Sequence, residues 1–63
     1  MLNRLTVEIR TDNDAFADGN DATECARILR LIAESLERGT RGMPLHDFNG
    51  NRVGRFDLTR VED

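Results

Sequence analysis

The sequence predicts a small α+β domain of βαββ type, in which one helix packs on one face of a three-stranded antiparallel sheet. Three observations support this prediction: an alternating apolar stretch over residues 4–10, an amphipathic segment over residues 22–38, and an Asn-Gly pair at residues 49–50 between two further alternating stretches. A chain of 63 residues can bury one small core, so we expect a single domain over residues 1–63 with a small stability margin.

The first strand is expected over about residues 4–10. Leu5, Val7 and Ile9 alternate with polar residues, which is the period of two of a strand with one buried face. The segment that follows, residues 11–20, is rich in Asp, Asn and Gly and is expected to form a loop. Phe16 is the apolar exception in this loop, and we expect it to fold back over one end of the core.

The helix is expected over about residues 22–38. Asp21 and Glu24 have the spacing of a capping box, in which the first side chain caps free amides and the second reaches back. Gly39 can adopt the left-handed conformation that ends many helices. Steps of about 100° per residue place one continuous apolar arc against the sheet. Its members are Ala22, Cys25, Ala26, Ile28, Leu29, Ile32, Ala33 and Leu36.

The last two strands are expected as a hairpin over about residues 43–48 and 51–59. Asn49-Gly50 is the strongest short sequence signal for a hairpin with a two-residue turn. The register that this turn sets keeps the apolar residues of both strands on one face. The expected pairs are Phe48 with Asn51, Leu45 with Gly54, and Met43 with Phe56.

The hairpin also predicts the order of the strands. Pro44 cannot donate a hydrogen bond to a ladder, which places residues 43–48 at an edge of the sheet. A helical return from the first strand makes the second strand parallel to it, so the third strand fits between them and the expected order is 1-3-2. Gly54 is expected to leave room for the helix or for a bulge.

Composition argues against several classes of protein. The net charge is −3, and no apolar run approaches the roughly 18 residues that a membrane helix needs. No secretory signal pattern follows Met1, and Cys25 is the only cysteine, so we expect a cytoplasmic location. All nine basic residues are arginine, which a GC-rich genome explains and for which bidentate recognition is the alternative.

We find no pattern that predicts catalysis, a metal site or a cofactor, and we expect a protein that is not an enzyme. His46 is the only histidine and has only Asp47 beside it as a potential partner. Cys25 lies on the apolar arc, where a packed core residue is expected rather than a reactive thiol. Residues 47–51 space oxygen atoms as a calcium loop does, but the glycine and the last acid of that loop are missing. Turn chemistry explains the same residues.

The helix offers a candidate surface for a protein partner. Leu31 lies outside the apolar arc and is expected to be exposed among charged residues, which is a composition found at protein interfaces. The alternative is an isolated surface leucine without a role. The candidate partner-binding residues are Arg27, Arg30, Leu31, Glu34 and Arg38.

Two charged regions are further candidates. The acidic loop before the helix can imitate nucleic-acid phosphates, although solubility is the simpler explanation; it contains Asp12, Asp14, Asp18 and Asp21. The open sheet face has arginines for nucleic-acid binding but is expected to lack the stacking aromatics of RNA-binding sheets. The residues of this alternative are Arg4, Arg10, Arg52 and Arg55.

A set of residues along nearly the whole chain resembles a group of short, uncharacterised proteins of bacteria, phages and other mobile elements. The shared pattern consists of Thr11-Asp12-Asn13, Ala15-Phe16, Glu24, Ala26 to Arg30, Leu36, Gly39 and Asp47-x-Asn49-Gly50-Asn51-x-Val53-Gly54. These residues are mainly turn and core positions and transfer no catalytic group. The resemblance implies an accessory protein of a mobile element, a class that often blocks or redirects a larger host protein, as anti-CRISPR and anti-restriction proteins do.

The expected function is therefore that of a small binding module with a larger host protein as its partner. Two alternatives remain open at this stage. One is arginine-mediated binding of nucleic acid, and the other is a self-associating structural protein in which edge strands or sheet faces pair two copies.

Overall fold

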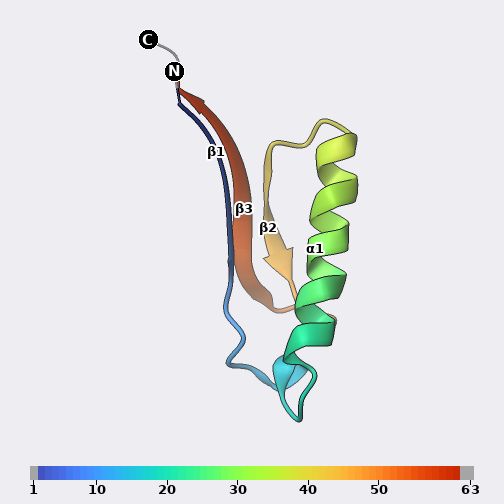
Figure 1. Cartoon of the computed structure of the whole chain (residues 1–63). Coiled ribbons are helices and arrows are strands. Elements are labelled where there is room, and N and C mark those ends of the chain that lie inside the picture. The colour runs from blue at the N-terminus through green and yellow to red at the C-terminus, as the bar shows by residue number, and fades with distance from the viewer. Residues whose placement is uncertain (1, 62–63) are drawn as a thin grey trace.

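The computed structural model describes residues 2–61 and has a βαββ fold (Figure 1). Both strand pairs are antiparallel, and the sheet order is β1-β3-β2, as predicted. A short 3-10 helix, η1, lies in the loop before the helix. The elements are β1 (Leu2–Ile9), η1 (Asp14–Phe16), α1 (Asp21–Glu37), β2 (Gly42–His46) and β3 (Arg52–Val61).

The register of the sheet gathers apolar residues of all three strands on one face. Phe56 of β3 is paired with Val7 of β1 on one side and with Met43 of β2 on the other. Leu45 is paired with Gly54, so the predicted register of the hairpin is confirmed over this part. Phe56 is fully buried and forms the centre of the sheet side of the core.

The turn of the hairpin differs from the expected two-residue turn. The strands end at His46 and begin again at Arg52, and the amide of Asp47 donates to the carbonyl of Asn51. The pairing of Phe48 with Asn51 was therefore wrong. A bulge next to Leu45 pairs His46 with Arg52, which leaves Val53 as an extra residue of β3. Val53 is buried by this bulge, whereas Arg52 is exposed.

The core lies between the sheet and α1 and is closed at one end by η1. Phe16 reaches it from η1, as predicted. Ile9, Cys25, Leu36 and Met43 are partly buried against the core. The buried apolar residues among those described are Ala15, Phe16, Ile28, Ile32, Leu45, Val53 and Phe56.

The helix does not bury the whole of the predicted apolar arc. Ile28 and Ile32 face the core, but Leu29 is exposed, as are Ala22 and Ala33. Two polar residues take their place, because Glu24 and Ser35 are buried. At about 100° per residue, the buried face is rolled by roughly 80° from the centre of the predicted arc.

The two ends of the helix are closed by different means. At the N-terminus the predicted capping box was wrong. Asp21 is the first residue of the helix and Asn20 is the N-cap residue, and the side chain of Glu24 binds Arg27 and the amide of Phe48 instead of reaching back. At the C-terminus Gly39 adopts the predicted left-handed conformation, with φ of 94°. Its amide donates to Leu36, and the amide of Thr40 donates to Ser35, which is the Schellman arrangement.

The molecule is elongated for its size. Its principal extents are 46, 21 and 17 Å, and β1 and β3 form a ribbon that runs alongside and past the helix (Figure 1). The accessible surface is 4554 Å², whereas a compact monomer of this mass is expected to expose about 4,100 Å². The chain therefore exposes more surface than an average folded monomer of its mass.

Gly54 is required by the close approach of β1. A Cβ atom at this position would overlap the carbonyl oxygen of Glu8, which belongs to the backbone of the neighbouring strand and cannot move aside. Gly54 was expected to leave room for the helix or for a bulge, but the room is taken by the backbone of β1. The bulge lies next to Gly54 in the sequence.

We predict that Gly54→Ala lowers the free energy of unfolding by about 3 kcal/mol or more, because backbone has to shift. Gly39→Ala is the control: nothing lies within 4 Å of its Cβ position, so it carries only the left-handed penalty of about 1–2 kcal/mol. Urea unfolding followed by circular dichroism measures both. Equal losses in the two variants would contradict the packing argument.

Candidate functional site

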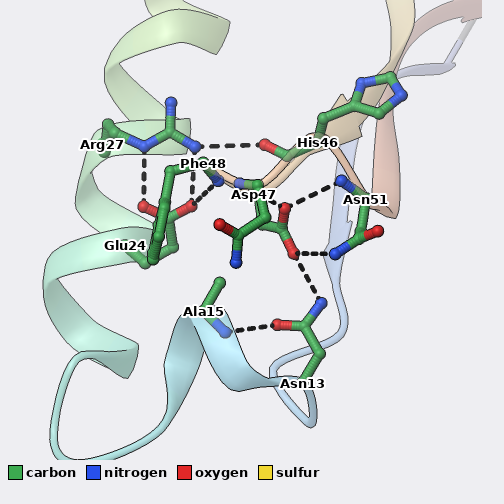
Figure 2. Close-up of polar contacts among 9 residues, drawn as sticks. Asn13, Ala15, Glu24, Arg27, His46, Asp47, Phe48 and Asn51 are labelled. Carbon is green, nitrogen blue, oxygen red and sulfur yellow. Dashed lines mark hydrogen bonds and ion pairs between the residues drawn. The ribbon is translucent and has the colours of Figure 1, made fainter.

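A polar network joins three segments that are far apart in the sequence (Figure 2). They are the first turns of α1, the turn between β2 and β3, and the segment that leads into η1. The carboxylates of Glu24 and Asp47 are at its centre, and both residues are buried. Buried carboxylates are costly unless they are paired, so the partners of these two groups determine how the segments fit together.

Glu24 ties the helix to the β2–β3 turn. Its two oxygens accept from Nε and Nη2 of Arg27, at 2.7 Å each. One of them also accepts from the amide of Phe48 at 2.9 Å, and Arg27 Nη2 donates onward to the carbonyl of His46 at 3.2 Å. The guanidinium of Arg27 lowers the pKa of Glu24 below its ordinary value of 4.5 despite burial, and the Phe48 amide adds to this.

Asp47 organises the turn itself. One oxygen accepts from the amides of Asn49 and Asn51, both at 2.9 Å. The other accepts from Nδ2 of Asn13 at 2.8 Å, and Asn13 in turn accepts from the amide of Ala15. Burial alone would raise the pKa of Asp47, but these hydrogen bonds outweigh it and hold the pKa below 3.8.

The network explains the spacing of oxygen atoms over residues 47–51. The oxygens of Asp47 face N–H donors of the chain, as the turn interpretation requires. Within residues 2–61 no three His, Cys, Asp or Glu residues lie close enough together to hold a metal ion. His46 is exposed at the end of β2, and its carbonyl oxygen takes part in the network.

The network presents Phe48 to solvent from a fixed backbone. Its side chain is 61% exposed, yet its amide is held by Glu24 and the following turn is held by Asp47. Phe48 was expected at the turn but not as a binding residue. The available signal was a large aromatic residue directly before an Asn-Gly pair.

The predicted helix surface lies on the flank of α1 that faces β2. Arg27 marks this flank because it contacts His46 of β2, and helical spacing places Leu31, Glu34 and Arg38 on the same side. Leu31 is exposed, as predicted. Arg30 lies further round the helix, away from the sheet.

Arg27 differs from the other members of this surface because its guanidinium is held inside the network. It lies between two exposed apolar side chains: Leu31 is one helical turn along, and Phe48 is held by the carboxylate that binds Arg27. We call Arg27, Leu31 and Phe48, with Glu34 and Arg38 at the rim, the helix–turn surface.

The acidic loop borders this end of the molecule. All four of its predicted residues are exposed, and the bond from Asn13 to Asp47 holds the loop against the β2–β3 turn. The side chain of Asp21 accepts from the amide of Ala22. The acidic residues are Asp12, Asp14, Asp18 and Asp21.

The arginines of the nucleic-acid alternative lie along β1 and β3. Arg55 is bound through two hydrogen bonds to Asp57, at 2.8 and 2.9 Å, and lies opposite Glu8. Arg10 donates to the carbonyl of Arg52 at 3.3 Å. Arg4 is opposite Thr59. Carboxylates thus lie between the arginines on this face, which weakens the positive potential that phosphate binding needs.

Comparison of the chain with protein-family models, curated proteins and solved structures found no match. None of the helices in residues 2–61 has the length and apolar character needed to cross a membrane.

We predict that Glu24→Gln lowers the free energy of unfolding by about 1–3 kcal/mol, because Arg27 loses its charged partner and one buried acceptor is weakened. Glu34→Gln makes the same change at an exposed position of the same helix and is expected to alter stability by less than about 0.5 kcal/mol. Urea unfolding of both variants measures the difference. Similar values would show that the Glu24 pair does not hold the fold.

The free energy of unfolding should also depend on pH through the carboxylates of Glu24 and Asp47. Their pKa values are lowered in the folded protein, so their contribution is fully present above the ordinary values of 4.5 and 3.8 and is lost as pH falls through the folded values. The urea midpoint is therefore expected to fall between about pH 5 and pH 2. The fall should be shallower in Glu24→Gln, whereas an identical slope in both proteins would contradict the assignment.

Proposed function

We propose that this protein is a non-enzymatic binding module whose partner is a larger protein. The observation that supports this most is the amount of large apolar side chain at its surface. Five such residues are exposed among residues 3–60, against six of comparable size in the core: Leu5 at 49%, Val7 at 39%, Leu29 at 48%, Leu31 at 42% and Phe48 at 61%. Single exposed apolar residues are ordinary, but in so small a domain this set nearly equals the core in number.

The helix–turn surface has the chemistry of an interface centre. It combines an aliphatic residue, an aromatic residue and an arginine, and Phe and Arg are enriched at the centres of protein interfaces. Phe48 is presented by a backbone that Glu24 and Asp47 already hold. Binding through a fixed backbone needs little further ordering, which favours affinity. The charged side chains of Glu34 and Arg38 supply a polar rim.

The resemblance to short proteins of bacteria, phages and other mobile elements adds a setting to this proposal. In that setting the module works in the cytoplasm and inhibits or modulates a host protein, for example a component of a CRISPR or restriction defence complex. The free thiol of Cys25 suits a reducing compartment. The acidic loop beside the β2–β3 turn offers an arginine-rich partner additional contacts.

The proposal is tested by recovery of partners from a bacterial lysate on immobilised protein, quantified by mass spectrometry. We expect Leu31→Glu to lower recovery of the specific partner by at least about tenfold, because a charge replaces an apolar contact at the interface centre. Leu29→Glu is the matched control, since it makes the same change at a similarly exposed residue about 200° away on the same helix.

Recovery by the control variant should equal that of the wild-type protein. Equal recovery by Leu31→Glu and wild type would remove the helix–turn surface from consideration. Circular dichroism confirms that both variants retain the helix.

A further inference from the structure

The outer edge of β1 is long and unprotected. The sheet order places β1 at one edge and β2 at the other. β2 has five residues and contains Pro44, features that protect an edge from pairing. β1 has eight residues without proline, glycine or lysine, and its pairing with β3 runs without a bulge. Every side chain from Asn3 to Glu8 is exposed. Natural proteins rarely leave such an edge unpaired.

The backbone groups at this edge can be identified from the ladder with β3. The amide of Arg10 donates to the carbonyl of Val53 at 2.7 Å, so Arg10 faces β3. Because facing alternates along an antiparallel strand, Glu8, Thr6 and Arg4 also direct their backbone groups toward β3. Those of Asn3, Leu5, Val7 and Ile9 point to the free edge.

The side chains of β1 are apolar on the face that carries the helix. Leu5 and Val7 are paired with Leu58 and Phe56, so they share the face of the core, yet both are exposed. They lack an apolar neighbour on the outer side. Leu29 is also exposed, on the flank of α1 opposite the one on which Arg27 contacts β2. The apolar surface of the core face thus continues to the edge of the sheet and stops there.

The polar face of β1 has a charge pattern that complements itself. An antiparallel copy centred on Thr6 places Arg4 opposite Glu8 of the second copy, and Glu8 opposite its Arg4. The same register pairs Leu5 with Val7 on the apolar face. A copy centred on Val7 instead would place Arg4 opposite Arg10, and one centred on Leu5 would leave Glu8 without an arginine. Only the centre at Thr6 matches both the charges and the apolar residues.

This register also agrees with the backbone. The outward-facing residues pair with one another, Leu5 with Val7 and Asn3 with Ile9, which gives four hydrogen-bonded pairs by symmetry and about eight backbone hydrogen bonds. Arg4 and Glu8 fall in non-hydrogen-bonded pairs, where opposing side chains are closest. Backbone, charge and apolar pattern therefore favour the same arrangement.

We propose that β1 is the dimerisation edge of this protein and pairs with β1 of a second copy, antiparallel and centred on Thr6. The two-fold axis is perpendicular to the sheet, so the product is a six-stranded sheet of order β2-β3-β1-β1-β3-β2 with both helices on the same face. The helix–turn surface lies at the opposite side of each copy, next to β2. The dimer would thus present two helix–turn surfaces, one at each end. The proposal of a dimer does not depend on which partner these surfaces bind.

The test is a charge exchange measured by sedimentation equilibrium at micromolar concentration. Wild type is expected at twice 7.1 kDa. Arg4→Glu and Glu8→Arg each place like charges opposite one another at two sites, so each is expected to dimerise at least about tenfold more weakly. Mixing the two variants restores both opposite-charge pairs and is expected to give a heterodimer of wild-type affinity. The double variant R4E/E8R is likewise expected to dimerise with itself.

A backbone variant tests the edge without charge. Val7→Pro removes an outward amide but none of the bonds to β3, and proline is tolerated in edge strands. We expect it to remain folded by circular dichroism and to sediment at 7.1 kDa.

Three results would overturn the proposal. Wild type at 7.1 kDa throughout the range leaves the edge to a strand of another protein. A wild-type dimer that Val7→Pro does not weaken uses another surface. If each single charge variant dimerises with itself as tightly as the two variants dimerise with each other, the register centred on Thr6 is excluded.

Discussion

The buried carboxylate of Glu24 determines how the helix lies on the sheet. A charge in this position has to be neutralised and hydrogen-bonded. Arg27 lies on the same helix and can neutralise it at any roll, so the contact that fixes the orientation is the hydrogen bond from the amide of Phe48. That orientation buries Glu24 and Ser35 and turns Leu29 outward. The protein therefore keeps a buried ion pair at the cost of apolar burial, and the exposure of Leu29 follows from this orientation.

The same constraint links the rigidity of one end of the molecule to its proposed function. Glu24 fixes the backbone at Phe48, and Asp47 fixes the turn at Asn49 and Asn51 and the entry to η1 at Asn13. The side chain of Phe48 is therefore exposed on a turn whose amides at positions 48, 49 and 51 are all hydrogen-bonded to buried carboxylates. The two proposed contacts depend on different features of the fold. The helix–turn surface depends on the polar network, and the edge of β1 depends on the sheet order and the charge pattern.

Local sequence signals were sufficient for the elements and for most of the sheet. The alternation around Val7, the left-handed Gly39 and the edge position of Pro44 each depend on neighbours in the sequence or on one pairing, so they could be predicted. The roll of the helix could not, because the group that holds Glu24 from outside the helix is the amide of Phe48, 24 positions away. Apolar periodicity alone favours Leu29 over Glu24 for the core.

The prediction of the turn was wrong for a related reason. Asn49-Gly50 predicts a two-residue hairpin from backbone preference, but the side chain of Asp47 binds two amides of the turn and widens it. The same carboxylate reaches Asn13, a contact that no spacing rule connects to a hairpin. The candidate helix residues were placed on a common flank by periodicity, while the role of Phe48 emerged only when the partner of its amide was known.

Residue-resolved amide hydrogen exchange at neutral pH tests most directly whether Glu24 holds the turn. The Phe48 amide lies in an exposed turn outside the strands, so its only expected protection comes from the Glu24 carboxylate at 2.9 Å. We predict slowed exchange of this amide in the wild-type protein and loss of the protection in Glu24→Ala, with the amides of β3 still protected. Exchange of the Phe48 amide at the rate of an unstructured peptide in the wild-type protein would contradict the account.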